Sequence, residues 1–180
     1  MRRIPDEYKL LIAGSGGQGI MFLGRVIAEA ALREGRHVTY IRSYGAEMRG
    51  GTAYCMVRIS PGEIASPVFE KASTAVLMNK PSLLRFRGSL EKDACVLVNS
   101  SLAHDSNTQG KEVLRVPLNE IAHQLGNSRV ANVVALGALI RQCPLVRKDS
   151  LEKVFKESFG AGSNLEKLNR QALEAGWNSR

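Results

Sequence analysis

The chain has 180 residues, of which 44% are hydrophobic and only 6% aromatic, and it carries 25 Lys and Arg against 17 Asp and Glu. This length and apolar content predict one α/β domain with an aliphatic core, as in parallel sheets covered by helices. The three cysteines, Cys55, Cys95 and Cys143, form no C-x-x-C pair, which argues against an iron–sulfur or zinc site made by this chain alone. Their small, odd number favours a reducing, cytoplasmic compartment over a disulfide scaffold.

The net charge of +8 favours anionic partners such as phosphates or acidic proteins. The basic residues are scattered in pairs rather than gathered in one arm, and we find no RNA-binding aromatic motif, so we expect no nucleic-acid partner. The segment Met1–Glu7 lacks the apolar core of a signal peptide, and the longest apolar run, Val130–Ile140, is too short to span a bilayer. We therefore expect a soluble cytoplasmic protein without membrane contact.

In chain order, apolar runs and turn residues predict strands that alternate with helices. The predicted strands are Lys9–Ala13, His37–Arg42, Ala53–Ser60, Ala75–Asn79, Cys95–Asn99 and Glu112–Val116. Helices are predicted at Ile20–Arg33, Asn119–Leu125 and Ser128–Arg141, with a basic helical or turn segment at Pro81–Leu90. Two capping-box patterns, Asp149-x-x-Glu152 and Ser163-x-x-Glu166, predict the starts of two last helices. One mixed or parallel sheet with helices on both faces accounts for this order in a single domain, residues 1–180.

A glycine-rich turn stands between the first predicted strand and the first helix. It matches G-x-G-x-x-G at Gly14, Gly16 and Gly19, which brings bare backbone N–H groups to a helix N-terminus, where a phosphate can bind. An NAD site also needs an acidic residue at the end of the second strand, where this chain has Ile41 and Arg42. Plain NAD is therefore disfavoured, Arg42 leaves NADP open, and a purely structural tight turn is the remaining alternative.

The loop Ser43–Thr52 follows the second predicted strand and contains several side chains that can bind a ligand. Tyr44, Glu47 and Arg49 present a ring, a carboxylate and a guanidinium, while the glycines of the loop allow sharp turns. In a parallel sheet this loop and the glycine-rich turn leave the carboxyl ends of adjacent strands, where ligands bind. Arg49 is predicted to hold a phosphate or carboxylate, with Glu47 orienting it. The alternative is a Glu–Arg pair of structural use only.

The remaining polar residues indicate no catalytic set. The residue types of a Ser-His-Asp triad occur together at Ser100, Ser101, His104 and Asp105. Side chains so close in sequence rarely form a triad, so we expect a polar turn there. His37 and His123 are far from them and from each other in sequence, and we see no metal constellation. Asn127 and Asn132 flank the start of a predicted helix, where we expect a cap and a buried hydrogen bond.

Several segments together resemble the gamma subunit of 2-oxoacid:ferredoxin oxidoreductases, in that family's order and over almost the whole chain. They are Gly14–Gly19, Ser43–Gly51, Val98–Leu102, Leu125–Asn127 with Asn132–Gly137, and Leu168-Asn169 with Ala175-Gly176. The second segment is more similar to the 2-oxoglutarate branch than to the pyruvate branch. One departure is Ala72-Ser73, where the family often has an acidic residue, and it puts any role for a carboxylate there in doubt.

The resemblance implies a three-layer, Rossmann-like α/β domain with a mostly parallel sheet and a helical C-terminal region. It implies a subunit of an enzyme that decarboxylates a 2-oxoacid on thiamine diphosphate, passes electrons through iron–sulfur clusters to ferredoxin and forms an acyl-CoA. Those cofactors would belong to alpha, beta and delta-type subunits, while this chain would contact coenzyme A and be inactive alone. The predicted contact residues are Gly14, Ser15, Gly16, Gly17, Gln18, Gly19, Ser43, Tyr44, Gly45, Glu47, Arg49, Gly50 and Gly51.

Three other functions stay open at this point. A free-standing NADP-dependent oxidoreductase would use Arg42 for the 2′-phosphate, although the chain offers no evident hydride-substrate site or second domain. The second is a nucleotide-sensing regulatory module, which would have no constitutive partners. The third is the gamma-type subunit of indolepyruvate:ferredoxin oxidoreductase, which shares the glycine loop.

Overall fold

The computed structural model describes residues 7–43, 52–103 and 113–179, and these form one sheet with helices on both faces. Its strands are β1 (Tyr8–Ser15), β2 (His37–Ser43), β3 (Thr52–Ser60), β4 (Ala72–Leu77), β5 (Leu90–Asn99) and β6 (Val113–Val116). Its helices are α1 (Ile20–Arg33), α2 (Lys80–Phe86), α3 (Leu118–Gln124), α4 (Ala131–Gln142), α5 (Lys148–Phe159) and α6 (Asn164–Asn178), with short 3₁₀ turns η1 (Arg87–Ser89) and η2 (Ser128–Val130). The predicted α/β class and the predicted strands are confirmed.

The strands lie in the order β2-β3-β1-β4-β5-β6. β3 runs antiparallel to both of its neighbours, while β1, β4, β5 and β6 are parallel, so the mostly parallel sheet is confirmed. The expectation that the first two strands are adjacent was wrong, because β3 lies between β1 and β2. The physical reason is the short connection from Ser43 to Thr52, which permits a hairpin but is too short for a crossover between parallel strands.

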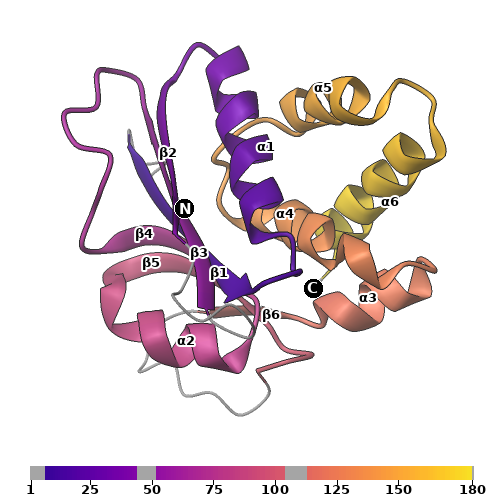
Figure 1. Cartoon of the computed structure of the whole chain (residues 1–180), viewed down its shortest axis with the longest axis horizontal. Helices are drawn as coiled ribbons and strands as arrows, with labels where there is room; N and C mark the ends of the chain where they lie inside the picture. The colour runs from indigo at the N-terminus through magenta and orange to yellow at the C-terminus, as the bar shows by residue number, and fades with distance from the viewer. Residues whose placement is uncertain (1–6, 44–51, 104–112, 180) are drawn as a thin grey trace.

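Two hydrophobic cores lie on the two faces of the sheet. Figure 1 shows α1, α4, α5 and α6 together on one side and α2 on the other. In β1, Leu10 and Ile12 pack into the larger core and Leu11 and Ala13 into the smaller one, and all four are buried. A central strand buried on both faces needs a continuous apolar run, which is the pattern seen in the sequence.

Helices α4 and α6 cross at two glycines. A Cβ built on Gly137 would lie 2.0 Å from the carbonyl oxygen of Leu173, and one on Gly176 would lie 1.9 Å from that of Val134. The two backbones therefore touch, and no side chain fits between them. This contact holds the C-terminal helix against the larger core.

The two predicted capping boxes have different outcomes. Ser163 caps α6, because its Oγ accepts a hydrogen bond from the backbone N–H of Glu166 at 3.1 Å. The prediction for Asp149 was wrong: α5 begins at Lys148 after Arg147, and no side chain from that position caps it. Instead the backbone N–H of Arg147 donates to Glu34, beyond the end of α1, at 2.7 Å, so a tertiary contact fixes the entry into this helix.

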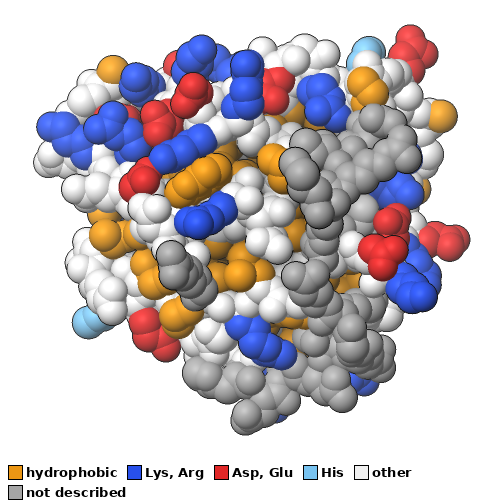
Figure 2. Space-filling view, turned by 180° about the vertical axis from the view of Figure 1, so that it is seen from behind, with side chains coloured by type: hydrophobic (Ala, Val, Ile, Leu, Met, Phe, Trp, Pro, Cys, Tyr) orange, Lys and Arg blue, Asp and Glu red, His pale blue; other side chains and the backbone are white. Residues whose placement is uncertain are grey.

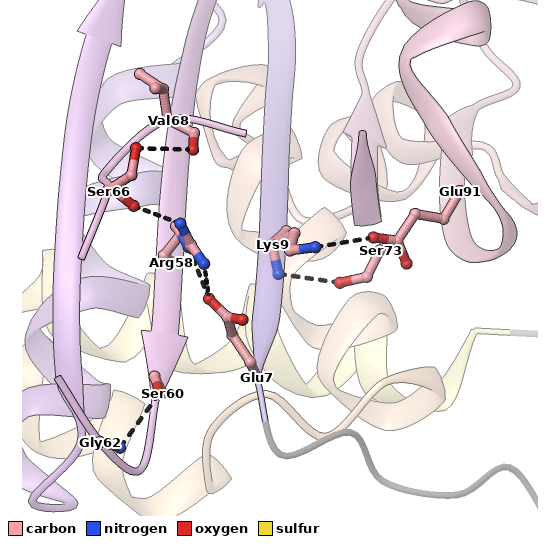
Figure 3. A network of polar contacts seen from close by, with 9 residues as sticks. All are labelled: Glu7, Lys9, Arg58, Ser60, Gly62, Ser66, Val68, Ser73 and Glu91. Atoms are coloured by element: carbon pink, nitrogen blue, oxygen red, sulfur yellow. Dashed lines mark hydrogen bonds and ion pairs between the residues drawn. The ribbon is translucent and has the colours of Figure 1, made fainter. Parts of the chain in front are cut away.

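A network of hydrogen bonds and ion pairs joins residues at the amino-terminal edge of the sheet (Figure 3). The backbone N–H of Lys9 donates to Ser73 Oγ at 2.9 Å, and the Lys9 ammonium pairs with Glu91 at 3.3 Å. Arg58 donates to Glu7 at 2.7 Å and also to the carbonyl of Ser66. Ser73 therefore has a structural role at the edge opposite the glycine-rich turn.

Two ionisable side chains in the larger core are held in their neutral forms. Burial raises the pKa of the Cys55 thiol from 9.0 to about 12, and burial likewise raises the pKa of the Tyr8 hydroxyl from 10.0 to about 12. All three cysteines are buried and free. Cys55 is thus a core residue rather than a nucleophile.

Candidate ligand-binding edge of the sheet

The glycine-rich turn joins β1 to α1 at the carboxyl edge of the sheet. Gly19 caps α1 with a left-handed φ of 71°, and a Cβ there would lie 2.1 Å from Asn132 Nδ2. A Cβ on Gly14 would lie 2.6 Å from Gln18 Oε1. Both glycines are thus required by the fold itself. α1 starts without a side-chain cap, which leaves its first backbone N–H groups open to an outside acceptor.

Gln18 is bound tightly to the neighbouring strand end. Its Oε1 accepts hydrogen bonds from the backbone N–H of Ser15 at 2.7 Å and from Asn79 Nδ2 at 3.0 Å. Asn79, which is 7% exposed, also donates to Ser15 Oγ at 2.8 Å and caps α2 through the N–H of Ser82. This network fixes the shape of the turn before any ligand arrives.

A second amide network follows at the end of β5. Asn99 is fully buried, and its Nδ2 donates to the carbonyl of Met78 at 3.1 Å and to Asn119 Oδ1 at 2.8 Å. Its Oδ1 accepts from the backbone N–H groups of Leu118 at 3.2 Å and Ser101 at 3.3 Å. Sequence reasoning gave Asn79 and Asn119 no role. The available signal was that Asn79 and Asn99 each end an apolar strand, where parallel sheets place functional side chains.

The predicted roles of Asn127 and Asn132 are confirmed. Asn127 accepts from the backbone N–H of Arg129 at 3.0 Å and so caps η2. Asn132, which is 6% exposed, donates to the carbonyl of Gly19 at 3.3 Å and thereby binds the start of α4 to the glycine-rich turn. Segments more than a hundred residues apart in sequence therefore meet at one edge.

Two hollows open at this edge. The smaller, of about 190 Å³, is lined by Gly17, Gln18, Met78, Asn119, Ser128, Arg129, Ala131 and Asn132. The larger, of about 580 Å³, is lined by Ser101, Leu102, Asn119, Glu120, His123, Gln124 and Ser128. Asn119 and Ser128 line both hollows, which therefore lie next to each other. They lie outside the carboxyl ends of β1 and β5, near the point between β1 and β4 where the strand order reverses.

The second predicted loop starts from the same edge. Ser43 pairs with Tyr54 and Ser15 with Thr52, so only the beginning of β3 separates the two segments. The predicted contact residues Tyr44, Gly45, Glu47, Arg49, Gly50 and Gly51 lie outside the described residues. Ser43 and the six residues of the glycine-rich turn are described.

The position of Arg42 argues against the NADP function. In dinucleotide-binding folds the residue that binds the ribose phosphate ends a strand beside β1. Here β2 is separated from β1 by β3, and the Arg42 guanidinium lies 5.9 Å from the centre of the Tyr40 ring on its own strand. Arg42 is therefore two strands away from the glycine-rich turn.

The charges on the face drawn in Figure 2 are mixed. In Figure 2, Lys and Arg side chains lie among Asp and Glu side chains instead of forming a continuous basic band. Several are paired, as in Arg33 with Glu157, Lys148 with Glu174 and Arg25 with Glu29. Within residues 7–43, 52–103 and 113–179, no three His, Cys, Asp or Glu side chains gather as metal ligands, and no helix has the length and apolarity needed to cross a membrane.

These features define an open, doubly wound α/β protein with a glycine-rich turn and ordered amides at its switch point. The chain belongs to the pyruvate ferredoxin/flavodoxin oxidoreductase family, whose model matches residues 9–179. The predicted family resemblance is thereby confirmed.

Named relatives support this membership. The ketoisovalerate oxidoreductase subunit VorA of Methanothermobacter marburgensis is 34% identical over 171 residues, which cover 94% of this chain and 36% of that protein. The chain thus spans about a third of the length of the VorA relatives that it matches. The 2-oxoglutarate synthase subunit KorC of Methanocaldococcus jannaschii is 30% identical over 180 residues, which cover 98% of this chain and 95% of that protein.

Solved structures share the fold. The gamma subunit of a keto/oxoacid ferredoxin oxidoreductase from Geobacter sulfurreducens has a TM-score of 0.82 at 27% identity, covering 94% of this chain and 96% of that chain. A 2-oxoglutarate:ferredoxin oxidoreductase from Magnetococcus marinus, solved with 2-oxoglutarate, coenzyme A and succinyl-CoA bound, has a TM-score of 0.88 at 23% identity, covering 96% of this chain and 31% of that chain. The overall fold of this chain is therefore shared with these solved structures.

Proposed function

We propose that this chain is the gamma-type subunit of a multi-subunit 2-oxoglutarate (2-oxoacid):ferredoxin oxidoreductase. The observation that best supports this proposal is the match to KorC, because it covers nearly all of both chains and leaves no further domain of that relative unmatched. In the proposed reaction the 2-oxoacid loses carbon dioxide, its acyl group passes to coenzyme A and electrons pass to ferredoxin. Alpha, beta and delta-type subunits are the proposed partners. Free, buried thiols favour a cytoplasmic complex.

In this proposal thiamine diphosphate and the iron–sulfur clusters reside on the partner subunits and supply the decarboxylation and the electron transfer there. The contribution of this chain is to bind and orient coenzyme A. Its glycine-rich turn fits a phosphate, because α1 starts without a side-chain cap and Gly16 and Gly17 are exposed. The Ser43–Gly51 loop starts from the same edge and would complete the contact.

The choice of 2-oxoacid rests on the Ser43–Gly51 segment, which is similar to the 2-oxoglutarate branch. The identity to VorA makes ketoisovalerate the second candidate substrate. Indolepyruvate is the third candidate substrate, because the indolepyruvate branch shares the glycine loop.

Omitting this chain is expected to abolish the CoA-dependent activity of the complex. The measurement is dye reduction by partner subunits purified with and without the chain, using 2-oxoglutarate, ketoisovalerate and indolepyruvate in parallel. Because the chain would position coenzyme A, its loss removes acyl transfer at any 2-oxoacid concentration. Full activity without the chain would contradict the proposed function. The acid with the highest kcat/KM identifies the substrate.

Arg49 is the proposed anion contact in the second loop, and Arg49→Ala is expected to raise the KM for coenzyme A about tenfold, since a charge-assisted hydrogen bond is lost. The KM for the 2-oxoacid should not change. Co-purification with the partner subunits is the control for assembly. An unchanged KM for coenzyme A in a fully assembled variant would remove this role from Arg49 and leave the proposed function standing.

A further inference from the structure

Two of the three cysteines lie on either side of one buried threonine. Cys95 on β5 pairs in register with Thr74 on β4, so their Cα atoms are roughly 4.8 Å apart. The Thr74 hydroxyl is also 3.5 Å from the sulfur of Cys143, the residue that follows α4. Cys95 and Cys143 both belong to the larger core, on the same face of the sheet. The two thiols therefore approach Thr74 from the neighbouring strand and from the helix that covers it.

The hydroxyl of Tyr8 lies beside the same two thiols. It donates a hydrogen bond at 3.2 Å to the carbonyl of Pro144, the residue after Cys143. Burial first, and then the negative charges of the Cys143 and Cys95 thiolates, raise the pKa of this hydroxyl to about 12. Charges shift a pKa in this way only over short distances, so both sulfurs lie near one oxygen. Side chains from β1, β5 and the end of α4 thus form one buried cluster, which the proposed reaction does not use.

A hollow of about 390 Å³ reaches the chain next to Cys143. Its lining includes Ile140, Pro144 and Leu145, which stand on both sides of that cysteine in the sequence. Cys143 is 9% exposed and Cys95 is 6% exposed, whereas Cys55 is fully buried. A small oxidant can therefore reach Cys143 before it reaches either of the other two cysteines.

We propose that Cys95 and Cys143 form a disulfide when the chain meets a peroxide. In the first step the sulfur of Cys143 attacks hydrogen peroxide, the O–O bond breaks, and a sulfenic acid and one water form. In the second step the sulfur of Cys95 attacks the oxidised sulfur, the S–S bond forms and a second water leaves. The two thiols give up two electrons in total, and the peroxide is reduced to water.

The disulfide would join the end of α4 to β5 and protect Cys143 from further oxidation. A sulfenic acid without a partner thiol goes on to sulfinic acid, which a thiol cannot reduce, whereas a disulfide is reversed by thiol exchange. The pair would therefore act as a reversible redox switch in the larger core. This switch goes beyond the proposed function and does not depend on it.

Cys55 supplies the internal comparison. Its sulfur donates to the carbonyl of Ile20 at 3.6 Å, and its strand, β3, is separated from β5 by β1 and β4. Three strand spacings, roughly 14 Å, exceed the Cα separation that a disulfide can bridge. Cys55 should therefore stay a thiol under conditions that oxidise the other two.

The test uses the full chain, which is reduced and then treated with hydrogen peroxide under native conditions. Trypsin places each cysteine on its own peptide, so mass spectrometry identifies every link. We expect one cross-link, between the peptides of Cys95 and Cys143, with the loss of two hydrogen atoms. Because the bond closes a loop of roughly 50 residues, the midpoint of thermal unfolding should rise by about 8 °C or more, and dithiothreitol should reverse the rise.

Three serine variants separate the steps. Cys143→Ser should abolish the cross-link, and Cys95→Ser should leave Cys143 as a sulfenic acid that dimedone labels. Cys55→Ser is the matched control and should form the cross-link as the unchanged chain does. A native chain that forms no link between Cys95 and Cys143, forms it only in urea, or links Cys55 instead overturns the proposal. None of these outcomes bears on the proposed function, because no partner subunit takes part.

Discussion

Replacing Gly176 with alanine is expected to lower the free energy of unfolding by about 3 kcal/mol or more, because the added methyl group has no space. Its Cβ would lie 1.9 Å from the carbonyl oxygen of Val134, a backbone atom that cannot move without shifting α4. At an exposed helix position the same change stabilises by about 1 kcal/mol, so the expected sign is reversed. Urea unfolding of the purified chain, followed by circular dichroism, measures the effect.

Gly137→Ala should behave in the same way, since its Cβ would lie 2.0 Å from the carbonyl oxygen of Leu173. The double variant should lose less than the sum of the two, because separating α4 and α6 once relieves both contacts. Gly88→Ala, whose Cβ meets no atom within 4 Å, is the control and should leave the midpoint unchanged. A stable Gly176→Ala protein would show that the helices do not approach as closely as described.

Replacing Asn99 with alanine is expected to cost about 3 kcal/mol of stability, because it breaks four hydrogen bonds, two of which are buried. The carbonyl of Met78 and the N–H of Leu118 would lose these partners in the core. Chemical denaturation measures the effect.

Asn127→Ala is the matched control for this prediction. Asn127 makes a single capping hydrogen bond to the backbone N–H of Arg129, so its loss should cost only about 1 kcal/mol. If the two variants lose equal stability, the Asn99 network is not the anchor of the strand ends.

Much of the fold could be predicted from local patterns. The bounds Ile20–Arg33 were predicted for α1 and found, because Gly19 and Gly35 frame an amphipathic run. The place of β3 could not be predicted from strand patterns alone, because an apolar alternation does not say which strand it pairs with. The length of the connection from Ser43 to Thr52 was the missed signal. The start of α5 was missed because Glu34, distant in sequence, binds the chain before it.

The amino-acid sequence by itself determined the α/β class, the glycine-rich turn at a helix start and the family to which the chain belongs, because strand runs, glycine spacing and motif order are local properties. The tertiary structure decided which glycines serve packing and which leave bare backbone. It also decided that Asn79, Asn99, Asn119 and Arg129 share one edge. Those contacts join residues of different strands and helices, and only the folded sheet brings the carboxyl ends of its parallel strands together.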